Sequence, residues 1–287
     1  MSNPEPWLSE FCRQRQLPPS YAADVERCCG SLIKTWAQRA AGASRPLVMG
    51  INGAQGSGKS TLAEILELIL SRRYGLRCAR LSIDDCYLGR AQRESLAAEV
   101  HPLFATRGVP GTHEIGLAEQ LFSRLADAGP IALPRFNKAT DDRMPAGQWP
   151  QVAGPIQLLL FEGWCIGCRP QPDAELASAL NRLESEEDAS GVWRRAVNAE
   201  LAGPYARLWQ ALDGLIMLRS PDWPAVRRWR GLQEQRLAAT HTGQYIMDDA
   251  ALDRFVEFFE RLTRWQWQDL PSRSDLVISL DADHRMG

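Results

Sequence analysis

The sequence predicts an α/β fold with a mainly parallel sheet. Short apolar segments alternate along the chain with longer segments of helical periodicity, which is the pattern of strands joined by crossover helices. The apolar segments are unbroken runs such as IQLLLF at 156–161, typical of strands that are buried on both faces. A glycine-rich turn joins the first of these segments to a helix. Polar residues that follow the strands are therefore expected at one edge of the sheet, where such folds bind ligands.

Each element follows from a local pattern of the sequence. Strands are expected at 46–51, 77–83, 156–161, 215–218 and 275–280. Helices are expected at 5–16, 22–40, 62–72, 90–100, 114–127, 193–211, 223–238 and 248–267. A further apolar segment, 131–133, follows the helix at 114–127. We expect residues 1–44 to form an N-terminal helical extension and residues 45–287 to form one domain.

Composition excludes several classes of function. No apolar run approaches the roughly 20 residues that cross a bilayer, and the N-terminus lacks the features of a signal peptide. The seven cysteines show no disulfide framework, and we interpret the C-x-x-C at Cys165 and Cys168 as buried thiols. A net charge of −2 argues against nucleic acid as a partner. We therefore expect a cytoplasmic protein whose partner is a small molecule; the oligomeric state stays open.

The segment GAQGSGKS at 53–60 has the spacing G-x-x-x-x-G-K-[ST] between a strand and a helix that starts near Lys59. Its glycines let backbone N–H groups wrap phosphate oxygens, and the helix adds the positive end of its dipole. Lys59 is expected to reach the β- and γ-phosphates, and Ser60 to ligate Mg²⁺. The sequence therefore predicts a P-loop that binds ATP and Mg²⁺. The residues expected to contact the nucleotide are Gly53, Ala54, Gln55, Gly56, Ser57, Gly58, Lys59, Ser60 and Thr61.

Three acids follow two other expected strands. Asp84 and Asp85 lie at the end of 77–83, and Glu162 lies at the end of 156–161. A carboxylate at such a position can hold a metal ion or accept the proton of an attacking hydroxyl. An Asx turn or a helix cap would explain the two aspartates equally well if they stood alone. Beside a P-loop, the three together indicate a transfer site.

These motifs resemble those of the phosphoribulokinase, uridine kinase and pantothenate kinase group of P-loop kinases. Within that group the chain is similar to plant-type D-glycerate 3-kinases over roughly residues 45–285. The segments that carry the finer resemblance are RGVPGTHE at 107–114, PRFNK at 134–138, the pair Asp142-Arg143, and WRGLQE at 229–234. The resemblance implies a three-layer α/β/α fold of the P-loop NTPase type, with a helical lid around 221–245.

The resemblance also implies roles for individual residues. Asp84 becomes the general base, although Asp85 stays open as an alternative, and Ser60, Glu162 and Asp85 become the metal site. Arg230 of the lid is expected to act with Lys59 on the charge of the transferring phosphoryl group. A glycerate carboxylate requires cationic donors. The residues expected to bind the acceptor are Arg107, His113, Lys138 and Arg143.

Several alternatives remain open at this stage. The acceptor-side cations could be solvated surface charges, and the lid arginines could form an exposed helix face. Three substitutions against the family pattern, Cys86, Glu114 and the Phe136-Asn137 pair, lie in the acceptor half. A pantothenate or nucleoside kinase and a non-catalytic ATP-binding protein are therefore rivals to a D-glycerate kinase. A GTPase is disfavoured because Thr140 stands where the N-K-x-D motif requires a carboxylate.

Overall fold

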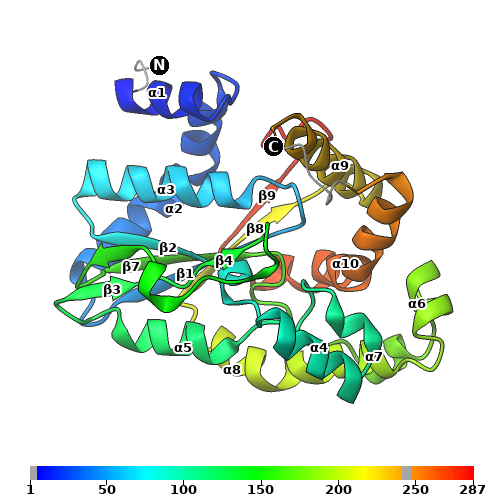
Figure 1. Cartoon of the computed structure of the whole chain (residues 1–287). Helices are drawn as coiled ribbons and strands as arrows, with labels where there is room; N and C mark the ends of the chain where they lie inside the picture. The colour runs from blue at the N-terminus through cyan, green and yellow to red at the C-terminus, as the bar shows by residue number, and fades with distance from the viewer. Residues whose placement is uncertain (1–4, 241–246) are drawn as a thin grey trace.

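The computed structural model describes residues 5–240 and 247–287, and it confirms the α/β fold (Figure 1). A five-stranded sheet with the order β2-β7-β1-β8-β9 forms the centre, and all its neighbouring pairs are parallel. Its strands coincide with the five segments in which the sequence predicts strands. They are β1 (Leu47–Gly53), β2 (Cys78–Ser82), β7 (Leu158–Gly163), β8 (Gly214–Arg219) and β9 (Leu276–Ser279). Because the pairing is parallel, the carboxyl ends of all five strands lie at one edge.

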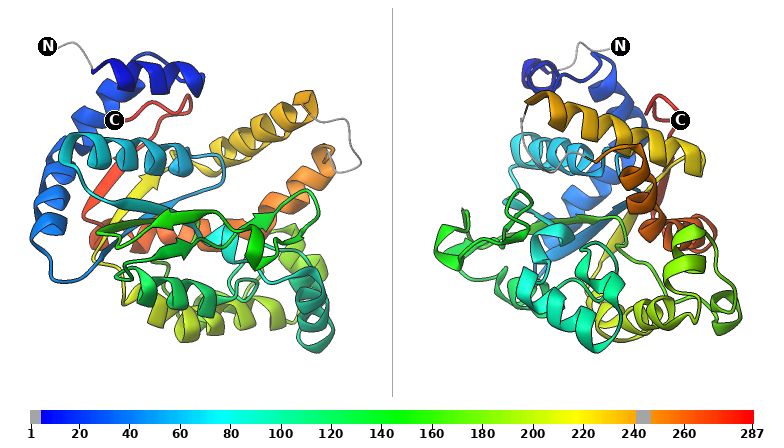
Figure 2. Two further views of the ribbon diagram at one scale, coloured as in Figure 1. Left: turned by 60° about the vertical axis from the view of Figure 1, so that its left-hand side comes forward. Right: turned by 45° about the vertical axis from the view of Figure 1, so that its right-hand side comes forward.

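Helices cover both faces of the sheet and make three layers (Figures 1 and 2). The first face carries α1 (Pro6–Gln14), α2 (Tyr21–Gly42) and α3 (Lys59–Tyr74), and the second carries α5 (Ile115–Arg124), α8 (Ala206–Trp209) and α10 (Asp249–Asp269). The remaining helices are α4 (Arg90–Glu99), α6 (Arg182–Glu187), α7 (Val192–Glu200) and α9 (Trp223–Thr240).

The central strands are apolar on both faces because each face has its own core. In β7, Leu158 and Leu160 pack in the core under α2 and α3, whereas Leu159 and Phe161 pack in the core on the opposite face. All four side chains are fully buried. This two-sided burial is the physical reason for the unbroken apolar runs in the sequence.

The prediction of one continuous helix at 193–211 is wrong. The chain forms α7, then a distorted segment Leu201–Tyr205, and then the short α8. Gly203 has non-helical dihedral angles (φ −102°, ψ −107°), and Pro204 follows it inside the segment. Proline lacks the N–H that a continuous helix needs and clashes with the preceding turn, so the pattern breaks here.

Two small antiparallel sheets and helix α6 lie outside the sequence prediction. One sheet pairs β3 (Pro130–Ala132), which contains most of the apolar segment 131–133, with β6 (Gln151–Ala153). The other is a hairpin of β4 (Phe136–Asn137) and β5 (Asp142–Arg143). Strands of two or three residues are too short to show a periodic pattern. Within the described part of the chain, no helix has the length and apolar character to cross a membrane.

Candidate active site

The P-loop connects β1 to α3 at the carboxyl edge of the sheet. Helix α3 begins at Lys59, directly after Gly58, which has a left-handed φ of 87°. Gly56 also has a left-handed φ, 77°, and a Cβ atom there would lie 2.6 Å from the Cβ of Trp229 in α9. Both positions therefore favour glycine because of their left-handed conformation, and Gly56 does so also because a side chain there would clash with Trp229. The turn presents the amino end of α3 to the cleft, an arrangement suited to phosphate.

Ser60 and Glu162 meet beside the P-loop. The Ser60 hydroxyl donates a hydrogen bond of 2.8 Å to Glu162 Oε1. Glu162 is 5% exposed, and its buried Oε2 has no hydrogen-bond partner among the described residues. A hydroxyl next to an unpartnered carboxylate oxygen fits Mg²⁺, which takes few protein ligands and completes its shell with phosphate and water. The described residues contain no cluster of three or more His, Cys, Asp or Glu side chains that could cage a metal by themselves.

Asp84 lies in a single turn of 3₁₀ helix (Ile83–Cys86) that follows β2 directly. Its Oδ1 accepts a hydrogen bond from the Tyr87 hydroxyl at 3.0 Å, and its Oδ2 accepts one from Lys138 Nζ at 2.6 Å. Burial opposes the charge of this carboxylate, but the positive charges of Lys138 and Lys59 outweigh burial and hold the Asp84 pKa well below its ordinary value. Asp84 is therefore ionised and able to accept a proton.

Asp85 contacts Arg135 and the first strand of the β4–β5 hairpin. Arg135 Nη1 donates to its Oδ2 at 2.5 Å, and the Phe136 N–H donates to its Oδ1 at 3.3 Å. Burial raises the Asp85 pKa, although Arg135 partly offsets that effect. Asp85 lines a second hollow of about 350 Å³ together with Ser60 and Glu162. A direct bond from Asp85 to a metal would cost it the Arg135 ion pair, so this geometry favours a role in holding the hairpin.

One cleft of about 570 Å³ collects most of the predicted site residues. Its predicted members come from the P-loop, the strand ends, two loops and the lid: Gln55, Gly56, Lys59, Ser60, Asp84, Glu162, Arg107, Lys138 and Arg230. Sequence reasoning missed the other members, which are Ser82, Tyr87, Trp164, Gln233, Phe255 and Phe259. Tyr87 and Trp164 follow the motif acids, so their positions could have been noticed. Phe255 and Phe259 have no sequence signal that separates them from core residues of a helix.

Arg107 and Lys138 form the cationic side of this cleft. The Arg107 guanidinium lies 5.5 Å from the centre of the Phe136 ring and pairs with Asp141. Lys138 pairs with Asp84, and the charge of that carboxylate raises the Lys138 pKa. Both cations line the same cleft as Lys59 and Asp84.

His113 and Arg143 do not line the cleft; they support it from behind. His113 is 5% exposed, stacks on Tyr87 with ring centres 4.4 Å apart, and shares a 2.6 Å hydrogen bond with the Tyr205 hydroxyl through Nδ1. Burial lowers the His113 pKa to about 4, so the ring is neutral at physiological pH. Arg143 pairs with Glu114 at 2.6 Å and donates to the Tyr87 carbonyl. A direct contact with the acceptor, as the sequence predicts for both, is not supported by this placement.

Helix α9 carries the lid arginines. Arg230 lines the cleft, lies 5.1 Å from the Phe255 ring centre and pairs with Glu234 at 2.6 Å. Arg227, one turn earlier, pairs instead with Asp253 of α10. The predicted lid at 221–245 extends beyond the described residues, because 241–246 are not among them.

Comparison with known proteins places these features in context. The signature of the phosphoribulokinase/uridine kinase family matches residues 48–168. The uncharacterized kinase mug58 of Schizosaccharomyces pombe is 32% identical over 228 residues, which cover 75% of this chain and 79% of that protein. The chloroplastic D-glycerate 3-kinase of Arabidopsis thaliana is 30% identical over 256 residues, or 83% of this chain. The match covers 53% of the plant protein, so this chain spans about half of that relative.

Two solved structures have the same fold. The YGR205w protein superposes with a TM-score of 0.72 at 22% identity, covering 92% of this chain and 95% of that one. A D-glycerate 3-kinase from Cryptococcus neoformans var. grubii superposes with a TM-score of 0.68 at 24% identity, covering 89% and 95%. At these identities the likeness establishes the fold alone.

Proposed function

Because the chain belongs to the phosphoribulokinase/uridine kinase family, we propose that it transfers the γ-phosphoryl group of ATP to a hydroxyl of D-glycerate. The observation that carries the proposal is the single cleft in which the P-loop lysine, the Ser60–Glu162 pair and Asp84 adjoin two cations. A kinase needs the first three groups for any acceptor. The cations specify an acceptor with negative charge.

The residues divide the work of transfer between them. The P-loop backbone and Lys59 would hold the β- and γ-phosphates, and Ser60 and Glu162 would hold Mg²⁺. When bound there, Mg²⁺ would supply positive charge that offsets the charge of the phosphates. Asp84 orients the acceptor hydroxyl and accepts its proton. To do so, its carboxylate gives up one of the hydrogen bonds that it accepts from Tyr87 and Lys138. Once Arg230 leaves its ion pair with Glu234, its guanidinium stabilises charge on the transferring group.

Two observations support D-glycerate as the acceptor. Arg107 and Lys138 offer a guanidinium and an ammonium on the wall next to Asp84, which suits a carboxylate close to the reacting hydroxyl. The Arabidopsis relative, at 30% identity, is named as a D-glycerate 3-kinase. The direct test is an ADP-release screen of the purified protein with ATP, Mg²⁺ and either D-glycerate, pantothenate, uridine or sugar acids. Turnover that is highest with D-glycerate is expected; turnover with uridine alone would refute this acceptor.

Replacing Asp84 with Asn tests the base. The variant keeps the shape of the side chain but cannot accept a proton, so kcat is expected to fall by about 100-fold or more. ATP affinity, measured by calorimetry, should stay within about threefold because Asp84 is not part of the P-loop that is expected to hold the phosphates. Asp127→Asn, at an exposed carboxylate whose one ion pair within residues 5–240 and 247–287 is with Arg124, serves as the control and should retain full activity. Near-wild-type turnover of Asp84→Asn would refute the assignment.

A further inference from the structure

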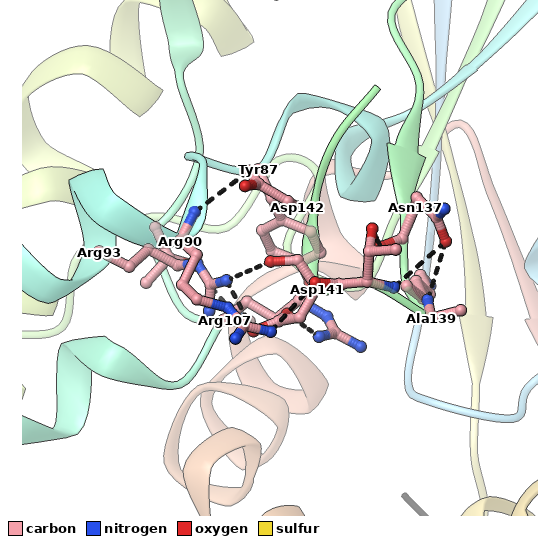
Figure 3. A network of polar contacts seen from close by, with 12 residues as sticks. Tyr87, Arg90, Arg93, Arg107, Asn137, Ala139, Asp141 and Asp142 are labelled. Carbon is pink, nitrogen blue, oxygen red and sulfur yellow. Dashed lines mark hydrogen bonds and ion pairs between the residues drawn. The ribbon is translucent and has the colours of Figure 1, made fainter. Parts of the chain in front are cut away.

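Asp141 pairs with Arg107 of the cleft and with the buried Arg93, and it lies in the same hairpin turn as Lys138. It occupies the turn of the β4–β5 hairpin and has a left-handed φ of 55°, one of three such non-glycine residues among those described. Three guanidinium groups surround it, those of Arg90, Arg93 and Arg107 (Figure 3). An acid held in an uncommon backbone conformation among three arginines indicates a specific structural role.

Arg93 fixes the position of Asp141. The Arg93 side chain is 2% exposed and donates to the backbone carbonyls of Leu88 and Ala105, each within 3.3 Å. One of its terminal nitrogens, Nη2, donates at 2.8 Å to both the carbonyl and the carboxylate Oδ2 of Asp141. A buried guanidinium with this many partners has little freedom to move, so it forms a rigid anchor for the hairpin turn.

The second carboxylate oxygen of Asp141 is directed at the cleft wall. Oδ1 accepts a hydrogen bond from Arg107 Nη1, while the Arg107 Nε and Nη2 have no hydrogen-bond partner among the described residues. Phe136 lies beside the same guanidinium, so Arg107 is held by an ion pair and an aromatic ring. The positive charges of Arg93 and Arg107 outweigh the effect of burial and lower the Asp141 pKa, which keeps this carboxylate charged.

We propose that Asp141 is a positioning residue, which presents the unpartnered N–H groups of Arg107 to the carboxylate of the acceptor. The proposal rests on the proposed function, because it assigns Arg107 to the acceptor rather than to ATP. Asp141 itself touches no cleft ligand and acts through Arg107. The same anchor also fixes the turn that carries Lys138, since residues 138–141 connect the two strands of the hairpin.

A double-mutant cycle with Arg107→Ala and Asp141→Asn tests this inference. Asn is well suited to the test because it tolerates a left-handed φ, and Asp141→Gly, which adopts that conformation freely, is a second variant for the case of poor folding. Asp141→Asn alone is expected to raise the KM for D-glycerate by about tenfold, the effect of a weakened charge-assisted contact, while the KM for ATP stays within about twofold. In the Arg107→Ala background the same substitution should change the KM for D-glycerate by less than about twofold.

Asp142→Asn is the matched control. Asp142 is the next residue along the hairpin. In the described part of the chain its carboxylate accepts hydrogen bonds only from the backbone N–H groups of Arg90 and Arg143, and the side-chain oxygen of Asn can accept the same two bonds. This variant should keep both KM values. Two outcomes would show that Asp141 is merely structural. In one, the double variant raises the KM for D-glycerate by the product of the two single effects; in the other, Asp141→Asn raises the KM for ATP and for D-glycerate equally.

The outcomes separate this inference from the proposed function. D-glycerate binding is also measured by calorimetry with ADP and Mg²⁺, so that the cycle can be completed without turnover. If the wild type turns over D-glycerate but the free-energy effects of Arg107→Ala and Asp141→Asn add in the double variant, only the role of Asp141 is overturned. Turnover of a different organic acid overturns the D-glycerate assignment, and the cycle is then run with that acid. Turnover of an uncharged acceptor alone overturns both.

Discussion

At the scale of single residues, the charge of Asp84 depends on its neighbours. Burial raises the energy of the ionised carboxylate, and the cations Lys138 and Lys59 reverse that effect. Lys138 also donates the 2.6 Å hydrogen bond to Oδ2. The ammonium of Lys138 therefore has two proposed tasks, since it keeps the base charged and attracts the acceptor carboxylate.

Replacing Lys138 with Met separates these tasks. Without the ammonium, less positive charge counters the effect of burial, so the Asp84 pKa rises. The carboxylate then becomes protonated at a higher pH than in the wild type. Because only the ionised form accepts a proton, the acid limb of kcat/KM should move to higher pH. The KM for the acceptor acid should rise by about tenfold as well.

The check is a profile of kcat/KM from pH 4 to pH 8. Lys34→Met removes an exposed lysine of α2 and should leave the profile unchanged. The wild-type limb from Asp84 should lie below this range, because the Asp84 pKa is held well below its ordinary value. If the Lys138→Met limb also stays below the range, Lys138 does not set the charge of Asp84.

At the scale of elements, the lid helix α9 packs directly on the P-loop. The backbone and Cβ of Trp229 lie against Gly56, and the Trp229 ring stacks on His284 at 4.1 Å. His284 Nε2 in turn lies 2.8 Å from the Gly56 carbonyl. The C-terminal segment, the lid and the phosphate loop therefore form one packed unit, and a change in one of them must affect the others.

Gly56→Ala tests this packing. The new Cβ would lie 2.6 Å from Trp229 Cβ, and alanine at a left-handed φ costs about 1 kcal/mol by itself. We expect the Kd for ATP to rise at least about tenfold and Tm to fall, because α9 and the P-loop must separate. Gly116→Ala in α5 is the control, since no atom lies within 4 Å of its added Cβ and alanine favours a helix. Unchanged ATP binding in Gly56→Ala would contradict the packing.

At the scale of the whole molecule, the N-terminal helices belong to one of the two cores of the sheet. Val25, Cys29, Ile33 and Trp36 of α2 are buried in the cluster that also contains the inner face of α3. Trp36 fits so closely against β8 that a Cβ at Gly214 would lie 2.2 Å from its ring. Removing α2 would therefore expose a large apolar face of both the sheet and α3.

Deletion of residues 1–44 is expected to abolish cooperative folding. Each buried large side chain contributes about 1.5–3 kcal/mol, and the sum for α2 reaches the whole stability of a typical protein. Among the described residues, deletion of residues 1–19 removes three buried side chains of α1 and the partly buried Trp7 and Leu17, so it should lower Tm more modestly. Thermal unfolding followed by circular dichroism measures both; a normal Tm for the longer deletion would mean that residues 45–287 fold alone.

The sequence by itself determined the five sheet strands, the P-loop and the acids that follow the strands. These features depend on local patterns: apolar runs, glycine spacing, and polar residues at strand ends. It missed the β4–β5 hairpin, whose strands are two residues long, and it placed a continuous helix across Gly203 and Pro204.

Only the tertiary structure decided which charges meet. Lys138 and Asp84 are 54 positions apart in the chain, and Arg107 and Asp141 are 34 positions apart. His113 and Arg143, which look equivalent to Arg107 and Lys138 in the sequence, lie behind the cleft wall instead of on it. Local patterns fix where a residue lies along the chain, whereas its burial and its partner depend on segments that folding brings together.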